Sequence, residues 1–263
     1  MPASALINVM TGAARKAARR LIRDFGEVEQ LQVSVKGPAN FVSAADLRAE
    51  QTLFEELSRA RPNYCFQMEE RGTVEGSDKT HTWIVDPLDG TTNFLHGVPL
   101  FCISIGLVRD GELVAALVMN PVSDETFTAE KGRGAFVNDR RLRVSARRQL
   151  DEALICTGIP HRGRPGHAQF RRDLEVVMTD TAGVRRTGSA ALDLAWTAAG
   201  RFDAFFERNL KPWDMAAGIL LVREAGGIVS DFDGRNTMLE SGHVLAGAPP
   251  IQRALQKALS ASA

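Results

Sequence analysis

The chain has 263 residues, of which 44% are hydrophobic, enough to bury the core of one large domain or of two closely joined ones. Lysine plus arginine equals aspartate plus glutamate at 32 each, so no overall field draws the protein to nucleic acid or to an anionic membrane. No segment approaches the run of about 20 apolar residues that a transmembrane helix needs, so we expect no membrane partner.

The apolar spacing predicts helices and strands in the first half of the chain. Apolar residues recur at helical spacing over residues 6–21, which predicts an amphipathic helix. A second helix is expected at 44–59, with Ser43 as its cap and Pro62 as its stop. Further expectations are a loop at 36–40, a strand at 83–85, a hairpin of strands 101–108 and 113–119 turning at Asp110-Gly111, and another hairpin around Asn138-Asp139.

The second half alternates between strands and helices, which is typical of an α/β protein. We expect strands at 154–158, 202–207 and 228–229, and helices at 169–179, 189–199 and 215–225. No repeat, low-complexity tract or linker separates two domains. We therefore predict a single unit over residues 1–263, with only a soft division near residue 150.

The cysteines and the N-terminal segment favour the cytoplasm. Cys65, Cys102 and Cys156 are odd in number and have apolar or small neighbours, which fits reduced thiols better than disulfides. Residues 1–25 interleave basic residues with alanines and lack the apolar run of a signal peptide. A cytoplasmic location is the expectation.

The carboxylates that most need an explanation are Asp86 and Asp89, which lie in the run Asp-Pro-Leu-Asp-Gly. The proline and glycine are expected to force the chain out of the preceding strand, so that both carboxylates converge. Their repulsion calls for a hard divalent cation such as Mg²⁺, which takes oxygen ligands and retains waters that a phosphate can displace. The carbonyl of Leu88 offers another oxygen, and residues 90–93 resemble a helix start, where N–H groups favour an anion.

Each acidic feature also has a simpler interpretation when taken alone. The run at 86–90 equally fits a polar turn at a strand end. Glu69 and Glu70 fit solvated loop charges, and Asp214, after Trp213 at the head of a helix, fits a helix cap. The five histidines have no paired spacing of the H-E-x-x-H kind, so zinc is not expected. Only the conjunction of the acidic positions favours a metal site.

Two long motifs make the chain resemble the inositol monophosphatase family. Residues 83–94, W-I-V-D-P-L-D-G-T-T-N-F, resemble its first signature, and residues 213–218, W-D-M-A-A-G, with E-A-G-G at 224–227, resemble its second. The stretch at 185–194 resembles more narrowly the bacterial extragenic-suppressor type. The resemblance implies the layered α/β/α/β/α sandwich of the metal-dependent, lithium-sensitive phosphatases, and a Mg²⁺-dependent phosphomonoesterase that hydrolyses inositol monophosphate with activated water.

The resemblance also assigns roles to individual residues. It implies two to three Mg²⁺ ions, held by Glu69, Asp86, Asp89, Asp214 and the carbonyl of Leu88. It implies Thr91, its acidic helper Asp46, and Glu69 as the catalytic residues. For the substrate it implies Asp89, Gly90, Thr91, Ser189, Ala190, Glu207 and Asp214.

The chain departs from the family pattern at two of these motifs. Ser43 stands where the family usually has threonine, which preserves the hydroxyl. Met68 replaces the glycine of a Gly-Glu-Glu sequence, so either Glu69 or Glu70 could be the ligand, and the spacing favours Glu69.

Several alternatives stay open within this resemblance. Relatives with similar metal motifs cleave fructose bisphosphate, histidinol phosphate, nucleoside bisphosphates or glycerol phosphate, and the metal site does not choose between them. The extragenic-suppressor type also implies a contact with RNA polymerase or a transcription factor, and a binding protein of the same fold is the rival hypothesis. The arginines at 140–148 fit a solvated face. The family further implies a homodimer.

Overall fold

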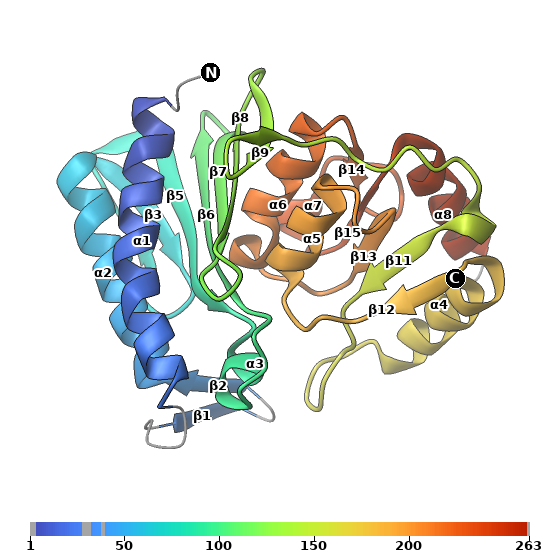
Figure 1. The fold of residues 1–263 in the computed structure, drawn as a ribbon, viewed down its shortest axis with the longest axis horizontal. Coiled ribbons are helices and arrows are strands. Elements are labelled where there is room, and N and C mark those ends of the chain that lie inside the picture. Colours follow the sequence, from blue (N-terminus) through green and yellow to red (C-terminus); the bar gives the residue numbers. More distant parts are fainter. Residues whose placement is uncertain (1–3, 28–32, 38–39, 262–263) are drawn as a thin grey trace.

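The computed structural model describes residues 4–27, 33–37 and 40–261. Within them the chain forms five stacked layers, helices and sheets alternating (Figure 1). This is the predicted α/β/α/β/α sandwich. No helix of the described part is long and apolar enough to cross a membrane.

The first two layers are a helix pair and an eight-stranded sheet. Helices α1 (Ala5–Phe25) and α2 (Ala44–Ala60) cover one face of the sheet, where α1 buries an apolar face that includes Met10 and Leu21. The strand order is β10-β9-β8-β7-β6-β5-β3-β4. The bounds are β3 (Tyr64–Met68), β4 (Gly72–Val74), β5 (Asp78–Asp89), β6 (Cys102–Arg109), β7 (Glu112–Asn120), β8 (Glu125–Glu130), β9 (Gly134–Val137) and β10 (Arg140–Arg141).

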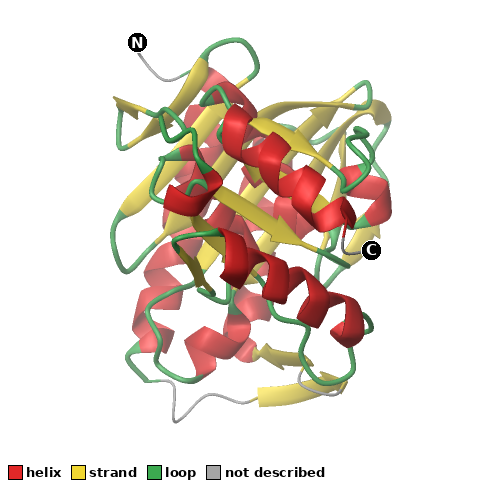
Figure 2. Cartoon of the chain, turned by 90° about the vertical axis from the view of Figure 1, so that its right-hand side faces the viewer, coloured by secondary structure: helices red, strands yellow, loops and turns green. Residues whose placement is uncertain are grey.

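The second sheet has five strands in the order β12-β11-β13-β15-β14. Its bounds are β11 (Leu154–Thr157), β12 (Gly183–Arg185), β13 (Ala204–Glu207), β14 (Ile228–Ser230) and β15 (Val244–Gly247). Strand β11 runs parallel to β12 and β13, whereas β15 runs antiparallel to β13 and β14. Figure 2 shows α4 (His167–Asp180) and α8 (Pro249–Ala261) crossing the outer face of this sheet.

The middle layer consists of α5 (Ala190–Ala198) and α6 (Pro212–Glu224), which lie between the two sheets (Figure 1). Both helices are rich in small residues, which lets them pack closely against each other and against the sheet. A Cβ atom on Gly218 of α6 would lie 2.4 Å from Cβ of Leu194 in α5, and a Cβ atom on Gly106 of β6 would lie 3.1 Å from Cβ of Ala216. Any larger residue at either glycine would push α6 away from its neighbours.

Smaller elements complete the fold. Strands β1 (Val33–Gly37) and β2 (Asn40–Ser43) form a separate two-stranded sheet. The short helix α3 (Thr91–Leu95) follows β5, a 3₁₀ turn covers Leu150–Glu152, and α7 (Met238–Ser241) precedes β15.

The structure confirms most of the predicted elements and shifts some of their ends. The two N-terminal helices, the hairpin at 110–111, the hairpin at 138–139 and the α/β alternation of the second half are all present. The helix expected at 215–225 begins earlier, at Pro212, because proline is well suited to a helix's first position. The loop expected at 36–40 was wrong in extent, since residues 36–37 belong to β1 and residue 40 to β2, while 38–39 lie outside the described residues.

Candidate active site

The Asp-Pro-Leu-Asp run is a β-bulge rather than a turn that leaves the strand, which corrects the expectation. Strand β5 continues to Asp89, and its register against β6 shifts between Asp86, opposite Ser104, and Asp89, opposite Cys102. Residues three apart in a regular strand point to opposite faces. The extra residue of the bulge cancels this alternation and brings both carboxylates to one side.

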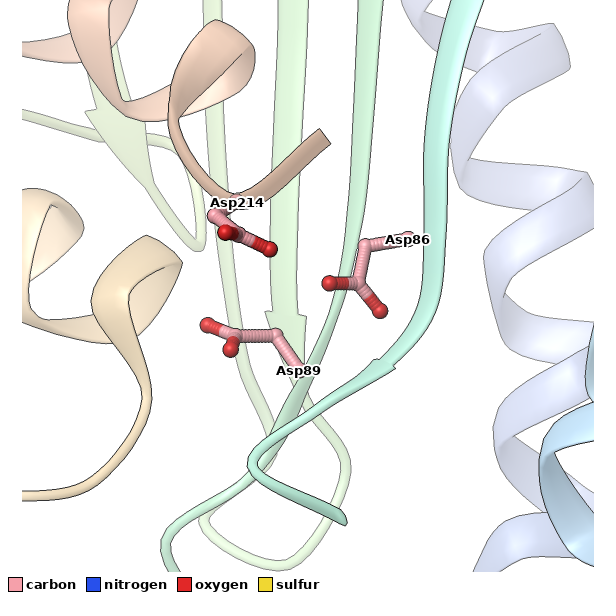
Figure 3. A group of neighbouring side chains, drawn as sticks. All are labelled: Asp86, Asp89 and Asp214. Carbon is pink, nitrogen blue, oxygen red and sulfur yellow. The ribbon is translucent and has the colours of Figure 1, made fainter. Parts of the chain in front are cut away.

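Asp214 reaches the same point from the first turn of α6. Its Oδ2 atom accepts a hydrogen bond from the backbone N–H of Lys211 over 2.7 Å, so Asp214 is also the third residue of a capping box at the start of α6. The Ser104 hydroxyl donates to the carbonyl of Trp213 over 3.2 Å and ties this helix end to β6. Figure 3 shows Asp86, Asp89 and Asp214 gathered around one point, and one carboxylate oxygen from each lies within 4.8 Å of the others.

Burial perturbs all three carboxyl groups, and repulsion by neighbouring carboxylates adds to its effect at Asp86 and Asp89. Burial raises the pKa of Asp86 well above its usual range, and the charges of Glu69, Asp89 and Asp214 raise it further. Burial also raises the pKa of Asp89 to about 7, with the charge of Asp214 as the next cause. The pKa of Asp214 is raised to about 6, again by burial. Such a cluster is stable in its ionised form only beside compensating positive charge.

The three aspartates open onto a cavity of about 150 Å³. It is also lined by most of the other predicted site residues, namely Glu69, Leu88, Gly90, Thr91, Ser189, Ala190 and Glu207. Asp46 does not line it but accepts a hydrogen bond from the Thr91 hydroxyl at Oδ1 over 3.1 Å. The fold thus gathers residues from both sheets and from α2, α3, α5 and α6 around one cavity.

The positions of Glu69 and Glu70 distinguish between them as candidate metal ligands. Glu69 lines the cavity, and its charge contributes to the raised pKa of Asp86. Glu70 does not line it, and its backbone N–H donates to Oε2 of Glu50 over 2.8 Å. The geometry therefore favours Glu69 as the residue of the acidic site.

Thr91, which lines the cavity, and Asp46 form a hydrogen-bonded pair. Oδ2 of Asp46 accepts from the backbone N–H of Ser43 over 2.9 Å and from its hydroxyl over 2.5 Å, as part of a capping box at the start of α2. This leaves Oδ1 for Thr91, whose hydroxyl lies 3.0 Å from the Leu88 carbonyl as well. Burial raises the pKa of Asp46.

The donor set fits a hard divalent cation. Within the described residues, the cluster offers carboxylate oxygens, with the Leu88 carbonyl beside them, and no histidine belongs to it. Cys102 lies nearby, with Sγ 3.9 Å from Oδ2 of Asp89, but burial raises the pKa of its thiol and disfavours a thiolate ligand. These ligands suit Mg²⁺ better than zinc.

Among the lining residues that sequence reasoning missed, four have ionisable side chains: His161, Arg164, Arg186 and Asp193. His161 and Arg164 lie in the connection between β11 and α4, where no periodic pattern indicates their direction. Asp193 is buried in α5, where its helix position alone suggests a packing role. Nothing in their sequence spacing marked these residues as neighbours of the aspartates.

An acidic oxygen cluster at a strand end and a helix start, in a layered α/β fold, is typical of the class of metal-dependent enzymes that act on phosphate esters. The sequence profile of the inositol monophosphatase family matches residues 3–263, and the chain belongs to that family. It is 60% identical to an inositol-1-monophosphatase of Mesorhizobium japonicum, over 98% of this chain and 97% of that protein. It is 45% identical to a Nus factor SuhB of Pseudomonas aeruginosa, over 95% and 94%.

A solved structure gives the same result for the fold. The extragenic suppressor protein suhB from Bartonella henselae superimposes with a TM-score of 0.95 at 56% identity, covering 97% of this chain and 98% of that one. The family and the fold predicted from the two motifs are confirmed.

Proposed function

We propose that this protein is a Mg²⁺-dependent phosphoric monoester hydrolase that converts inositol 1-phosphate and water to inositol and phosphate. The observation that carries the proposal is the convergence of Asp86, Asp89 and Asp214 from a bulged strand and a helix start, with ligand atoms within 4.8 Å of one another. The 60% identity to an inositol-1-monophosphatase supports the substrate.

Two to three Mg²⁺ ions would be held by the acidic residues of the cavity. One ion would be held by Glu69, Asp86 and the Leu88 carbonyl. A second would be held by Asp86, Asp89 and Asp214. A third would be held by Glu69 and by water molecules. Bound Mg²⁺ supplies Lewis acidity, which activates water and offsets negative charge on the phosphoryl group and the departing oxygen. Because Asp86 would hold two of the ions, it should be the least replaceable residue for Mg²⁺ binding.

The Thr91–Asp46 pair would orient the attacking water. The Thr91 hydroxyl directs its one proton to Oδ1 of Asp46 or to the Leu88 carbonyl, and in either case a lone pair of its oxygen is left to accept a hydrogen bond from water. The water oxygen forms a bond to phosphorus while the ester P–O bond breaks. The water gives up one proton and the departing inositol oxygen gains one, so that inositol and hydrogen phosphate are the products. Glu69, which also lines the cavity, would act as the third catalytic residue.

The remaining predicted residues would bind the substrate. Gly90 has φ +96°, and a Cβ atom there would lie 2.9 Å from the Leu100 carbonyl oxygen, so only glycine fits beside the N–H groups proposed for phosphate. On the polyol side we place Asp89, Ser189, Ala190, Glu207 and Asp214. Burial raises the pKa of Glu207 to about 8, which lets its carboxyl group donate or accept hydrogen bonds with hydroxyls near neutral pH.

A phosphate-release screen tests the proposal. Purified protein with Mg²⁺ is offered inositol 1-phosphate, fructose bisphosphate, histidinol phosphate, a nucleoside bisphosphate and glycerol phosphate. We expect the fastest release from inositol 1-phosphate and inhibition by lithium. Preference for another ester would keep the hydrolase and replace the substrate, whereas no Mg²⁺-dependent release from any of them would remove the proposal.

We propose a contact with the transcription machinery as a second role, because one relative at 45% identity is a Nus factor SuhB. A complementation test separates the two roles. If the Asp86→Asn protein hydrolyses nothing yet fully restores the phenotype of a strain that lacks the gene, then the binding role is the one that matters in the cell.

We also propose a homodimer in the cytoplasm. The cytoplasmic location is supported by Cys65, Cys102 and Cys156, which are all buried and free. Light scattering on the purified protein tests the dimer, for which a monomer mass would be the contrary result.

A further inference from the structure

A buried series of hydrogen bonds connects helix α5 to the carboxylate of Asp89. Its members Asp193, Thr187 and Ser189 are 1%, 9% and 1% exposed. The Thr187 hydroxyl donates to Oδ1 of Asp193 over 2.5 Å, and the backbone N–H of Ser189 donates to the Thr187 hydroxyl oxygen over 3.3 Å. The Ser189 hydroxyl then donates to Oδ2 of Asp89 over 2.7 Å.

Asp193 decides which way the Thr187 hydroxyl points. This hydroxyl has one proton and two possible acceptors, Oδ1 of Asp193 at 2.5 Å and the Ser189 carbonyl at 3.5 Å. The carboxylate is the closer and stronger acceptor. With the proton directed there, the oxygen lone pairs are available to the Ser189 N–H, which fixes the backbone that carries the Ser189 side chain.

The same segment is held from its other side by helix α3, which follows β5. The side-chain amide of Asn93 donates to the carbonyl of Thr187 over 2.8 Å and lies 2.6 Å from the carbonyl of Leu100. Gly188 has φ +95°, and a Cβ atom there would lie 2.9 Å from Nδ2 of Asn93. Residues 187–189 are therefore held between α5 and α3 with little freedom.

The outcome of this series is a carboxylate with one oxygen already engaged. Oδ2 of Asp89 accepts from the Ser189 hydroxyl and from the backbone N–H of Ala191, both over 2.7 Å. These two donors, with the Cys102 thiol 3.9 Å from the same oxygen, fill its lone-pair directions, which leaves Oδ1 for a cation. The rotation of the carboxylate about its χ2 bond is thus set by α5 and the segment before it.

We propose that Asp193 is a positioning residue which, through Thr187 and Ser189, fixes the orientation of the Asp89 carboxylate and thereby raises the affinity of the acidic site for Mg²⁺. The inference rests on the proposed function only in taking Asp89 as a metal ligand. Groups that orient a metal ligand typically change metal affinity about 10- to 100-fold when they are removed.

The test compares Thr187→Val with Thr187→Ser in Mg²⁺ titrations by calorimetry without substrate. Valine keeps the shape of threonine and loses the hydroxyl, so Mg²⁺ binding should weaken at least about tenfold. Serine keeps the hydroxyl and should bind as the wild type does. Asp193→Asn keeps an acceptor oxygen and should also stay close to wild type, whereas Asp193→Ala should behave like Thr187→Val.

Thr237→Val is the matched control, because it removes the same kind of bond away from the site. The Thr237 hydroxyl donates to Oδ2 of the buried Asp231 over 2.6 Å, and neither residue lines the active-site cavity. This control should lose stability and keep wild-type Mg²⁺ affinity. If Thr187→Val also keeps wild-type affinity, the inference is overturned. Should Asp193→Ala fail to fold, the Thr187 pair still decides.

Kinetics separate this inference from the proposed function. In an active enzyme, Thr187→Val should need at least about tenfold more Mg²⁺ for half-maximal rate and recover its kcat at saturating Mg²⁺, with KM for the ester little changed. A wild-type protein that releases no phosphate, yet shows the difference in Mg²⁺ affinity between Thr187→Val and Thr187→Ser, would refute the function and keep the inference.

Discussion

At the scale of single residues, burial and like charge both oppose the ionisation of Asp86. It is 2% exposed, and the charges of Glu69, Asp89 and Asp214 add to the effect of burial on its pKa. A bound divalent cation favours the ionised form of Asp86 instead, because it offsets several negative charges at once. The metal-free site should therefore reduce the stability of the fold, and the metal-bound site should increase it.

Replacing Asp86 separates activity from stability. We expect Asp86→Asn to lower the rate of phosphate release at saturating Mg²⁺ by about a hundred- to a thousandfold, because an amide neither balances the cations nor bridges them. The melting temperature without metal should stay the same or rise, since one repulsive charge is gone. Steady-state kinetics and thermal unfolding measure the two effects. Asp139→Asn, in an exposed turn, is the control and should change neither.

The raised pKa values also predict how stability depends on pH. Without metal, Asp89 and Asp214 keep their protons up to about pH 7 and about pH 6, whereas in the unfolded chain they ionise near pH 4. The folded state then binds more protons than the unfolded state in this window, so this contribution to stability is lost as the pH rises through it.

Mg²⁺ replaces those protons, so its stabilising effect should grow with pH. We expect the Mg²⁺-induced rise in melting temperature to be larger at about pH 8 than at about pH 5. Thermal unfolding with Mg²⁺ and with a chelator, across this range, measures the difference. A rise that is constant or shrinks with pH would contradict the assignment of these carboxyls to the metal site.

At the scale of elements, the active site depends on how closely α6 approaches α5 and the eight-stranded sheet. Asp214 stands at the start of α6, and the position of that helix is set by the glycine contacts at Gly218 and Gly106. Helix packing at this distance leaves no room for an added methyl group. The small residues of α6 thus allow close packing against α5 and the sheet, at the expense of intrinsic helix stability.

Two helical glycines should respond in opposite ways to alanine. Gly218→Ala should destabilise the protein by about 1 to 3 kcal/mol, because its Cβ atom would lie 2.4 Å from Cβ of Leu194. Gly12→Ala, in α1, has no atom within 4 Å of the added Cβ and should stabilise by up to about 1 kcal/mol. Urea unfolding measures both free energies. Stabilisation by Gly218→Ala would show that the two helices have room to separate.

At the scale of the whole molecule, one apolar cluster spans both sheets. It contains Ile84 and Val118 from the eight-stranded sheet, Phe205 from the five-stranded sheet, and Leu194 and Met215 from the helices between them. The eight-stranded sheet uses residues 64–141 and the five-stranded sheet 154–247. The predicted single unit with a soft division near residue 150 stays a prediction, and the shared cluster is the reason to expect cooperative unfolding.

Tryptophan fluorescence can test this cooperativity. Trp83 lies buried in the eight-stranded sheet, and Trp196 lies in α5. In variants in which Trp213 and one of these two are replaced, we expect urea transitions with the same midpoint and slope, coincident with the loss of helical circular dichroism. An earlier transition reported by Trp196 than by Trp83 would divide the chain into two units.

The sequence alone predicted the family, the layered fold and several of its helices and strands. Helical spacing predicted α1 and α2, and Asp110-Gly111 predicted the β6–β7 hairpin, because both signals are local. The two motifs at 83–94 and 213–218 predicted the family and the five-layered fold. Short strands such as β12 and β15 escaped prediction, since three or four residues carry too little pattern and their partners lie far away in the chain.

What the sequence determined by itself was the inventory of acidic ligands and the family to which they belong. What only the tertiary structure decided was direction and proximity: the bulge that turns Asp86 and Asp89 to one side, the nearness of Asp214, and the series from Asp193 to Asp89. The reason is that a residue's chemistry is carried by its side chain, whereas its neighbours are set by backbone register and helix packing over the whole chain.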